Sequence, residues 1–319
     1  MKGILLLLLL ALLPGLAMAE EGGSGHYFPG SMASFIDGVP PTETLITRVN
    51  LIYYKGSIDA GMPLPIGGQT ALGVDAASWG FGLTLLWRPP LDLGDRWSYA
   101  LSATIPYLLM DVSGDVNTTL PSGASASVHR SSSTNALGDI VLMPLMFNYN
   151  AHPDFNLNFR MGIYAPTGDY EVGRLANTGK NYWTFEPTVS LSYISSKIGL
   201  ELTAFAGLDF NTENHDTDYQ SGTQFHLDVT AAQHLPLFGG TIGVGANFFY
   251  YQQLEDDSGS GAKFFGDFKG RTIGIGPVLS YITKVWQHDL AAELKWLPEI
   301  DVGNRLKGDS IWFKLAMAF

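Results

Sequence analysis

The sequence predicts an all-β protein: a transmembrane antiparallel up-and-down β-barrel of about 12 strands, with a short N-terminal plug or cap segment. Two observations predict this fold. Apolar and polar residues alternate along the whole chain after an apolar leader. The last run alternates too, with Ile311, Phe313, Leu315, Met317 and Phe319 on one face. A strand whose outer face meets lipid needs such a uniformly apolar face.

Residues 1–19 have the features of a signal peptide that is cleaved. Lys2 supplies a positive charge, and residues 4–13 form an apolar stretch too short to span a bilayer as a helix. Ala17-Met18-Ala19 is a small-x-small cleavage site, so we expect cleavage before Glu20. An uncleaved membrane anchor remains the alternative. We therefore divide the chain into a signal peptide (1–19), a plug or cap segment (20–42) and an outer-membrane barrel (43–319).

Composition favours a membrane barrel over a soluble protein. Hydrophobic residues make up 46% of the chain but charged residues only 15%, whereas about a quarter is charged in soluble proteins. There is no cysteine, so neither disulfides nor thiolate chemistry are available. The net charge of −12 argues against nucleic acid as a partner, because phosphate binding needs a basic surface.

Each predicted strand is a run of period-2 alternation. In the second run, for example, Trp79, Phe81 and Leu83 alternate with Gly80 and Gly82. The twelve runs lie near residues 45–53, 79–87, 97–105, 141–149, 155–164, 182–193, 198–210, 225–230, 242–250, 273–281, 290–296 and 311–319. The fourth and eighth runs alternate least cleanly.

The connections between these runs are alternately long and short. The long ones lie near residues 56–74, 111–134, 166–180, 211–221, 252–268 and 299–308, and the short ones near 88–95, 150–153, 195–197, 235–239 and 283–288. Long external loops and short periplasmic turns give an outer-membrane barrel this rhythm, and an even strand number leaves both termini in the periplasm. A soluble β-sandwich would require no such alternation, nor aromatic residues near the strand ends.

The segment before the first strand is too apolar for a free tail and too rich in proline and glycine for a long strand or helix. We expect it inside the barrel as a plug, with an ordered cap on the periplasmic rim as the alternative. Small inward residues such as Gly80, Gly82, Ser98 and Ser190 leave space for it. The residues assigned to this plug or cap are His26, Tyr27, Phe28, Pro29, Ser31, Phe35 and Asp37.

Several motifs resemble one family of outer-membrane barrels, named for the meta-pathway of phenol degradation. They are Gly25-His26-Tyr27 with Pro29-Gly30-Ser31, Gly138-Asp139-Ile140, Pro166-Thr167-Gly168-Asp169-Tyr170, the run from Gly179 to Pro187, and Gly274-Ile275-Gly276-Pro277. The resemblance spans essentially the whole mature chain. It implies an outer-membrane barrel that helps small hydrophobic compounds to enter. It carries no settled catalytic or binding residues. The terminal Phe319 likewise resembles the C-terminal signal that the barrel-insertion machinery reads.

Ionisable side chains inside the strands should face the lumen, because the lipid face penalises charge. We expect Arg160 and Glu186 to form a cross-strand ion pair, with Tyr164 and Tyr182 facing each other one layer further. This network would be either a functional constriction or a purely structural feature. The predicted lumen network comprises Arg48, Arg160, Tyr164, Tyr182, Glu186, Glu201, Asp209, His226, Asp228, Asp289, Glu293 and Lys295.

No enzyme site emerges from the sequence. The seven histidines show no metal-ligand spacing, and no serine is tied to His226 and Asp228 as a nucleophile. We therefore predict no cofactor and no metal. Acidic loops near residues 209–218 and 255–257 are either solvated or a site for divalent cations.

The predicted function is a passive outer-membrane channel for uptake of small hydrophobic or aromatic compounds. Its partners would be outer-membrane lipid, these solutes and the insertion machinery, with Phe264, Phe265 and Phe268 as external apolar contacts. One alternative is a general polar diffusion porin. Another is a closed barrel that binds a partner through its external loops.

Overall fold

The computed structural model describes residues 20–38, 44–59, 61–119, 125–262 and 269–319. The predicted signal peptide with its cleavage site, residues 39–42 of the predicted plug, and Phe264, Phe265 and Phe268 lie outside the described residues.

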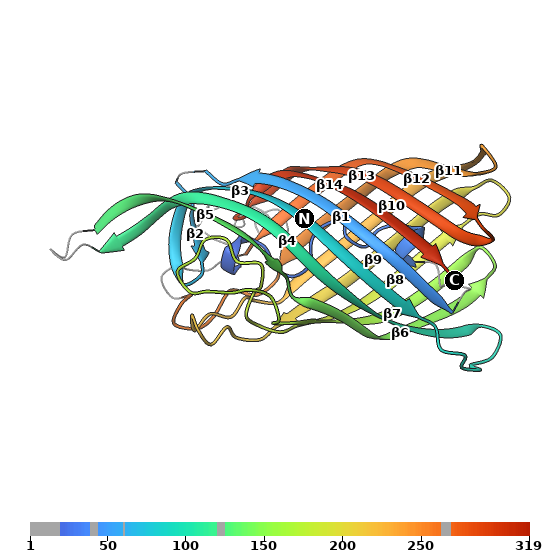
Figure 1. The fold of residues 1–319 in the computed structure, drawn as a ribbon, viewed down its shortest axis with the longest axis horizontal. Coiled ribbons are helices and arrows are strands. Elements are labelled where there is room, and N and C mark those ends of the chain that lie inside the picture. The colour runs from blue at the N-terminus through green and yellow to red at the C-terminus, as the bar shows by residue number, and fades with distance from the viewer. Residues whose placement is uncertain (1–19, 39–43, 60, 120–124, 263–268) are drawn as a thin grey trace, which may run out of the picture.

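Twelve antiparallel strands close into the predicted barrel, and two further strands extend it (Figure 1). The barrel strands are β1 (Leu45–Ser57), β3 (Gln69–Trp87), β4 (Trp97–Thr119), β6 (Ile140–His152), β7 (Phe155–Ala165), β8 (Thr184–Ile194), β9 (Leu200–Asn211), β10 (Gln224–Leu237), β11 (Gly240–Gln253), β12 (Arg271–Val285), β13 (His288–Gly303) and β14 (Lys307–Ala318). The additional strands are β2 (Pro63–Ile66) and β5 (Ser125–Leu137). Two short helical turns, η1 (Glu21–Gly23) and α1 (Phe35–Gly38), precede β1.

The barrel closes where the first strand meets the last. β1 pairs with β14 along its length, from Ile46 opposite Ala318 to Ser57 opposite Lys307. The Phe319 backbone N–H donates to the carbonyl of Leu45 at 2.8 Å, so the terminal residue is part of the seam. Each barrel strand thus has a neighbour on both sides, which removes the open edge that a flat sheet would expose.

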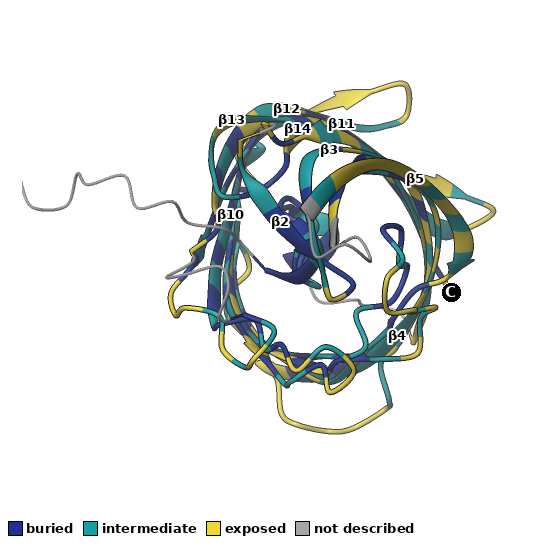
Figure 2. Cartoon of the chain, turned by 90° about the vertical axis from the view of Figure 1, so that its left-hand side faces the viewer, coloured by how far each residue is buried: buried dark blue, intermediate teal, exposed yellow. Residues whose placement is uncertain are grey.

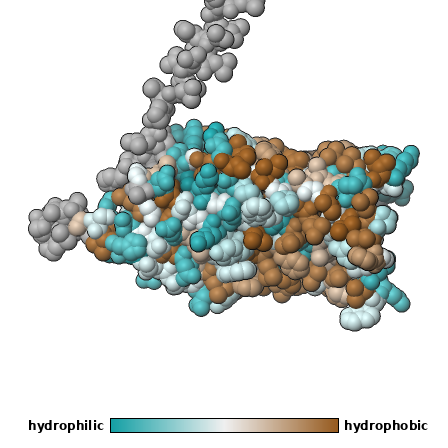
Figure 3. All heavy atoms as spheres, turned by 90° about the horizontal axis from the view of Figure 1, so that it is seen from above, coloured by the Kyte–Doolittle hydropathy of each residue, from teal (hydrophilic) through white to brown (hydrophobic). Residues whose placement is uncertain are grey.

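As expected for a membrane barrel, apolar residues lie on the outside and polar residues on the inside, the reverse of a soluble protein. Trp79 and Leu85 are each 50% exposed on the outer surface, while Thr84 between them and Glu186 on β8 are buried. Figure 3 shows apolar residues gathered around the part of the barrel nearer the short turns, with polar residues at the long-loop end. This distribution suits a barrel that is surrounded by lipid over part of its length.

Two of the predicted long loops contain strands. β3 and β4 extend beyond the predicted runs, and β5 pairs with β4 from Leu137 opposite Tyr107 to Ser125 opposite Thr119. The segment is rich in serine, threonine and asparagine, so it has no apolar stripe that would reveal a strand. Residues 138–139 interrupt the wall between β5 and β6, which pair with successive parts of β4.

A compact apolar cluster closes part of the long-loop end. Leu64 and Ile66 of β2, Val74 of β3 and Val112 and Val116 of β4 are buried together with other residues there. In the end-on view of Figure 2, β2 lies within the outline of the ring. Among the described residues, no helix has the length and apolar character needed to cross a membrane.

Candidate ligand cavity and the N-terminal segment in the lumen

The described N-terminal segment, residues 20–38, lies inside the barrel. Its residues contact inward side chains on many strands. Among the strand residues that hydrogen-bond to it are Arg48 of β1, Arg160 of β7, Thr184 of β8, Glu201 of β9, Asp228 of β10, Lys295 of β13 and Lys314 of β14. Figure 2 shows this buried segment within the ring of strands.

Asp37 anchors the segment near the short-turn end of the lumen. Its carboxylate lies 2.7 Å from Nη1 of Arg48 and 2.5 Å from Nζ of Lys314. Burial alone would raise the pKa of Asp37, but the two cations hold that pKa well below its usual range. Arg160 adds a hydrogen bond from Nη2 to the carbonyl oxygen of Asp37 at 2.7 Å.

The middle of the segment is held by Asp228 and Lys295. Asp228 accepts the backbone N–H of Gly30 at 2.9 Å and the hydroxyl of Tyr27, while Lys295 donates to the Gly30 carbonyl at 2.5 Å. Gly30 has a φ of +84°, and a Cβ there would lie 2.2 Å from a methyl of Leu297. Glycine is therefore required at this position, both for the backbone conformation and for the space.

His26 crosses the lumen between two polar groups of the barrel. Its Nδ1 lies 2.7 Å from Oγ1 of Thr184, and its Nε2 lies 2.9 Å from Oδ2 of Asp139. The rings of Tyr164 and Tyr182 lie 4.9 and 5.0 Å from the imidazole. Burial lowers the pKa of His26, although Asp139 opposes this shift. Both ring nitrogens of His26 thus have polar partners, and two tyrosine rings contact the imidazole.

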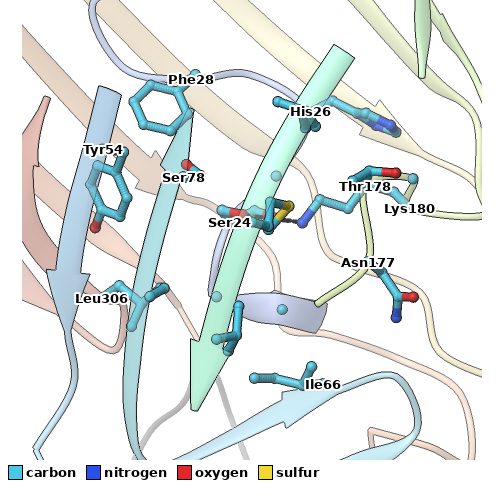
Figure 4. Close-up of a pocket in the computed structure, with 18 of the residues that line it drawn as sticks. Ser24, His26, Phe28, Tyr54, Ile66, Ser78, Asn177, Thr178, Lys180 and Leu306 are labelled. Atoms are coloured by element: carbon cyan, nitrogen blue, oxygen red, sulfur yellow. Dashed lines mark hydrogen bonds between the residues drawn. The ribbon is translucent and has the colours of Figure 1, made fainter. Parts of the chain in front are cut away.

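A cavity of about 310 Å³ lies between the segment and the wall formed by β1, β3 and β4. Figure 4 shows Phe28, Tyr54, Ile66, Ser78 and Leu306 around it. Its apolar lining also includes Ile52, Val74, Ala76, Leu108, Met110, Val112, Val141, Leu175 and Trp312. A large, mostly apolar cavity with a few polar groups is the usual form of a small-molecule site.

Several polar groups line this cavity near Lys180. Lys180 donates from Nζ to the carbonyl of Ser24 at 2.5 Å, and His26 and Asp139 also line the space (Figure 4). Burial lowers the pKa of Lys180, an effect that Glu20, Glu21 and Asp139 oppose. Glu299 and Arg305 also line the cavity. A ligand with one hydroxyl on an apolar body would find polar partners beside Lys180 and His26.

A second cavity of about 200 Å³ adjoins the first. Both are lined by His26, Phe28 and Trp312, and the second also reaches Met32, Arg48 and the glycines of β3. The ring of Phe28 lies edge-on to those of Tyr54 and Trp312 at 5.4 Å each. One aromatic side chain thus contributes to the lining of both spaces.

Most of the predicted lumen residues face inward. Glu201 accepts the backbone N–H of Phe35 at 2.7 Å, and Lys295 lies 3.4 Å from Glu293. Lys314 donates to the carbonyl of Ser31 at 2.6 Å, and Pro29 lines the cavity. The buried members of the predicted set are Arg160, Tyr164, Tyr182, Glu186, Glu201, Asp209, His226, Asp228, Glu293 and Lys295, with Arg48 partly buried.

Two details of the predicted network are wrong. The register places Glu186 opposite Gly162 and Arg160 opposite Thr188, so the expected Arg160–Glu186 pair does not form. Tyr164 lies opposite Thr184, and Tyr182 precedes the strand. The predicted register assumed a loop with symmetric ends, but the actual pairing is displaced by two residues. Asp289, also in the predicted inward set, pairs with Lys284 at 3.0 Å next to the turn between β12 and β13.

Sequence reasoning missed the contributions of Asp139, Lys180, Arg305 and Trp312. Asp139 and Lys180 lie in predicted connections, where a charged residue normally meets solvent. Arg305 is buried against Glu20, with 3.3 Å between Nη1 and Oε1. The Gly138-Asp139 and Gly179-Lys180 motifs were noticed, but nothing in the sequence shows that they meet. Backbone approach at Gly168, where a Cβ would lie 2.6 Å from Gly179, brings these loops together.

The comparisons with known proteins agree with this architecture. The COG4313 outer membrane channel from Pseudomonas putida F1 is 15% identical, with a TM-score of 0.66 over 92% of this chain and 100% of that one. A Pseudomonas aeruginosa FadL homologue is 10% identical, with a TM-score of 0.44 over 94% and 98% of the two chains. A search among curated protein sequences found no match. The model of the family described as "Putative MetA-pathway of phenol degradation" matches residues 63–315. The chain belongs to this family, and its fold is that of an outer-membrane channel.

Proposed function

We propose that the protein is a passive outer-membrane channel that admits small hydrophobic or aromatic compounds. The observation that carries this proposal is the apolar cavity of about 310 Å³ between the N-terminal segment and the barrel wall. An apolar cavity of about 150 Å³ is enough to bind benzene. A single-ring aromatic with one or two substituents therefore matches the larger space in size and in chemistry.

The polar groups of the cavity favour a ligand with a hydroxyl at one end. His26 lies between Thr184 and Asp139, and the Lys180 ammonium lies at the same side of the cavity. A phenolic hydroxyl could exchange hydrogen bonds with these groups while its ring contacts Phe28 and Leu108. Transport would follow the concentration gradient, because nothing in the chain supplies energy.

Asp139, His26 and Thr184 are hydrogen-bonded in the order found in a catalytic triad: carboxylate, imidazole and hydroxyl. The arrangement nevertheless favours a structural role. The Thr184 side chain is fully buried and its hydroxyl also bonds Oδ1 of Asn211 at 2.6 Å. A nucleophile needs access to its substrate. The proposal is accordingly that of a channel and not of an enzyme.

The location proposed for the protein is the outer membrane. Residues 1–19 would direct export, Phe319 would be read by the insertion machinery, and both termini would lie in the periplasm. The long-loop end would then face outward, and residues 20–38 would act as a plug. Apolar residues around the barrel near the short turns support this orientation (Figure 3).

A general polar diffusion pore is the second candidate, favoured by a different part of the lumen. Asn158 of β7, Thr188, Ser190 and Ser192 of β8 and Thr203 of β9 form a buried polar wall opposite the apolar cavity. Such a wall suits water and small polar solutes. In this alternative the N-terminal segment would have to leave the lumen.

The deciding experiment is single-channel conductance of the refolded mature protein in a planar bilayer, with and without phenol or toluene. We expect a nearly silent barrel in which the aromatic produces flicker or a small change in current. Toluene binding to the same preparation should saturate in a fluorescence titration. Stable open steps that are indifferent to the aromatic would support the polar pore and refute hydrophobic uptake.

A further inference from the structure

Three buried side chains from neighbouring strands converge beside the N-terminal segment. They are Glu186 of β8, Asp209 of β9 and His226 of β10, and their candidate ligand atoms all lie within 4.8 Å of one another. Nε2 of His226 lies 3.0 Å from Oε1 of Glu186 and 3.9 Å from Oδ1 of Asp209. All three side chains are completely buried.

The hydrogen-bonding capacity of this cluster is largely unused. Neither carboxylate oxygen of Asp209 has a hydrogen-bond partner, and neither ring nitrogen of His226 has one. The 3.0 Å contact between His226 and Glu186 is not aligned as a hydrogen bond. Glu186 is better satisfied, because its Oε2 accepts the hydroxyl of Tyr164 at 2.7 Å. A buried carboxylate without a partner is costly unless it is paired, protonated or bound to a metal.

The nearest basic side chains are committed elsewhere. Arg160 donates to Oδ1 of Asn158 and to the backbone of Asp37, and Arg305 pairs with Glu20. In the described part of the chain, no lysine or arginine lies within ion-pairing distance of Glu186 or Asp209. Neither carboxylate therefore has a lysine or arginine in contact, whereas Asp37 has Arg48 and Lys314.

We propose that Glu186, Asp209 and His226 bind a divalent transition-metal ion of the Zn²⁺ type. One imidazole nitrogen and two carboxylate oxygens form a nitrogen–oxygen donor set that suits Zn²⁺. Bonds of about 2.0–2.2 Å place tetrahedral ligands roughly 3.3–3.6 Å apart. The observed separations of 3.0 and 3.9 Å bracket this range, so modest side-chain rotations suffice.

Two neighbouring residues give the cluster its shape. Gly207 lies opposite His226, and a Cβ at that position would be 2.3 Å from Nε2. The absence of a side chain there leaves room for the imidazole to turn toward the carboxylates. Tyr27 stacks on the other side of His226, with ring centroids 3.6 Å apart and planes inclined by 13°. A bound ion would thus join three strands and, through Tyr27, fix the N-terminal segment.

No sequence motif indicates this site, and the sequence predicts no metal. Each ligand comes from a different strand, so no local spacing of the kind found in helical or loop metal motifs is present. Only the lateral order β8–β9–β10 brings the three residues together.

Direct metal binding tests the proposal. The full barrel is refolded without metal and incubated with Zn²⁺ or Co²⁺, then desalted and measured by elemental mass spectrometry. We expect about one retained ion per chain, a Co²⁺ absorption spectrum typical of low-symmetry coordination, and a thermal transition that rises with metal concentration. Asp209→Asn and His226→Gln should weaken binding by more than the roughly 10–100-fold typical of a lost supporting residue.

His234→Gln is the matched control. His234 also faces a buried acid, with Nε2 2.6 Å from Oε2 of Glu201, but it belongs to no group of three ligands among the described residues. This variant should retain the ion. Loss of metal in the control but not in Asp209→Asn, or no retained ion in the folded wild-type barrel, overturns the proposal. The wild-type measurement decides even if a variant fails to fold, as judged by heat-modifiable gel mobility.

Discussion

Lys314 on the last strand and Asp37 in the N-terminal segment form an ion pair that is sealed from solvent. Nζ lies 2.5 Å from Oδ2, and neither side chain is more than 1% exposed. The same carboxylate binds Arg48 on the first strand at 2.7 Å. Because β1 and β14 form the seam of the barrel, one residue of the segment joins both sides of that seam.

Asp37→Asn should destabilise the barrel strongly. The substitution removes the negative charge between Lys314, which is buried, and Arg48, which is partly buried, and leaves Lys314 only the longer ionic contact with Glu293 at 3.7 Å. Breaking a buried pair costs about 3–5 kcal/mol. Denaturant unfolding of the refolded protein measures the loss of free energy. Asp301→Asn is the control, since its pair with Arg271 has the same 2.7 Å separation but is about half exposed. That substitution should cost no more than about 1 kcal/mol.

Deleting residues 22–38 should open a larger ionic conductance. The segment fills the lumen and is bound by side chains of strands around the ring, so its removal leaves a water-filled space lined by polar and charged groups. Single-channel recording of the deletion variant measures the effect. Unchanged conductance would show that the segment is not a plug.

Acid should loosen the segment at His26. Burial lowers the pKa of His26 below the usual histidine value of about 6.5, so the folded state binds a proton less readily than the unfolded state. The stabilising contribution is present above about pH 6.5 and is lost as pH falls through the lowered folded pKa. Channel current of the wild type should rise as the pH falls through the lowered pKa of His26, and His26→Gln should reduce this pH dependence. An equal response in both proteins would contradict the assignment.

Much of the fold could be predicted because the lipid face imposes a strict rule. Trp79, Phe81, Leu83 and Leu85 all had to be apolar, and this period-2 pattern located the barrel strands. β5 escaped prediction because neither of its faces carries a continuous apolar stripe. Polar residues such as Ser131, Ser132 and Ser133 suit a solvated loop as well as a strand, so no pattern distinguishes the two.

The site was predicted as a set of inward residues but not as a set of contacts. The side of the sheet on which a residue lies follows from its odd or even position along a strand, which the sequence shows. Glu186, Asp209 and His226, predicted to face the lumen, are all buried. Contacts depend on strand register, and the predicted register differs from the actual one by two residues. It therefore placed Arg160 opposite Glu186, whereas the structure places Arg160 opposite Thr188. The contacts of Asp139 and Lys180 depend on loop folding, for which a single sequence contains no comparable rule.

Ser78→Phe should block the cavity without disturbing the barrel. Ser78 lies on the inward face of β3 and lines the cavity, as Figure 4 shows, so a phenyl ring there would occupy space proposed for the ligand. Saturable toluene binding should be lost, while thermal stability changes little. Ala103→Phe on β4 is the control, because Ala103 lies between the lipid-facing positions 101 and 105 and adds the same ring outside. Equal toluene binding by both variants would exclude this cavity as the site.

Removing Phe319 should impair assembly in cells much more than refolding in detergent. Its backbone bonds Leu45 across the seam, and its ring lies 5.0 Å from that of His288. These contacts lie at the end of the seam, and the twelve register pairs between β1 and β14 remain without them. A chain lacking Phe319 should therefore refold in vitro with a thermal stability close to that of the wild type.

If the terminal aromatic is the signal read by the insertion machinery, the same chain should accumulate unfolded in the periplasm, which fractionation and heat-modifiable mobility would detect. Normal insertion in cells would show that Phe319 serves only to complete the seam.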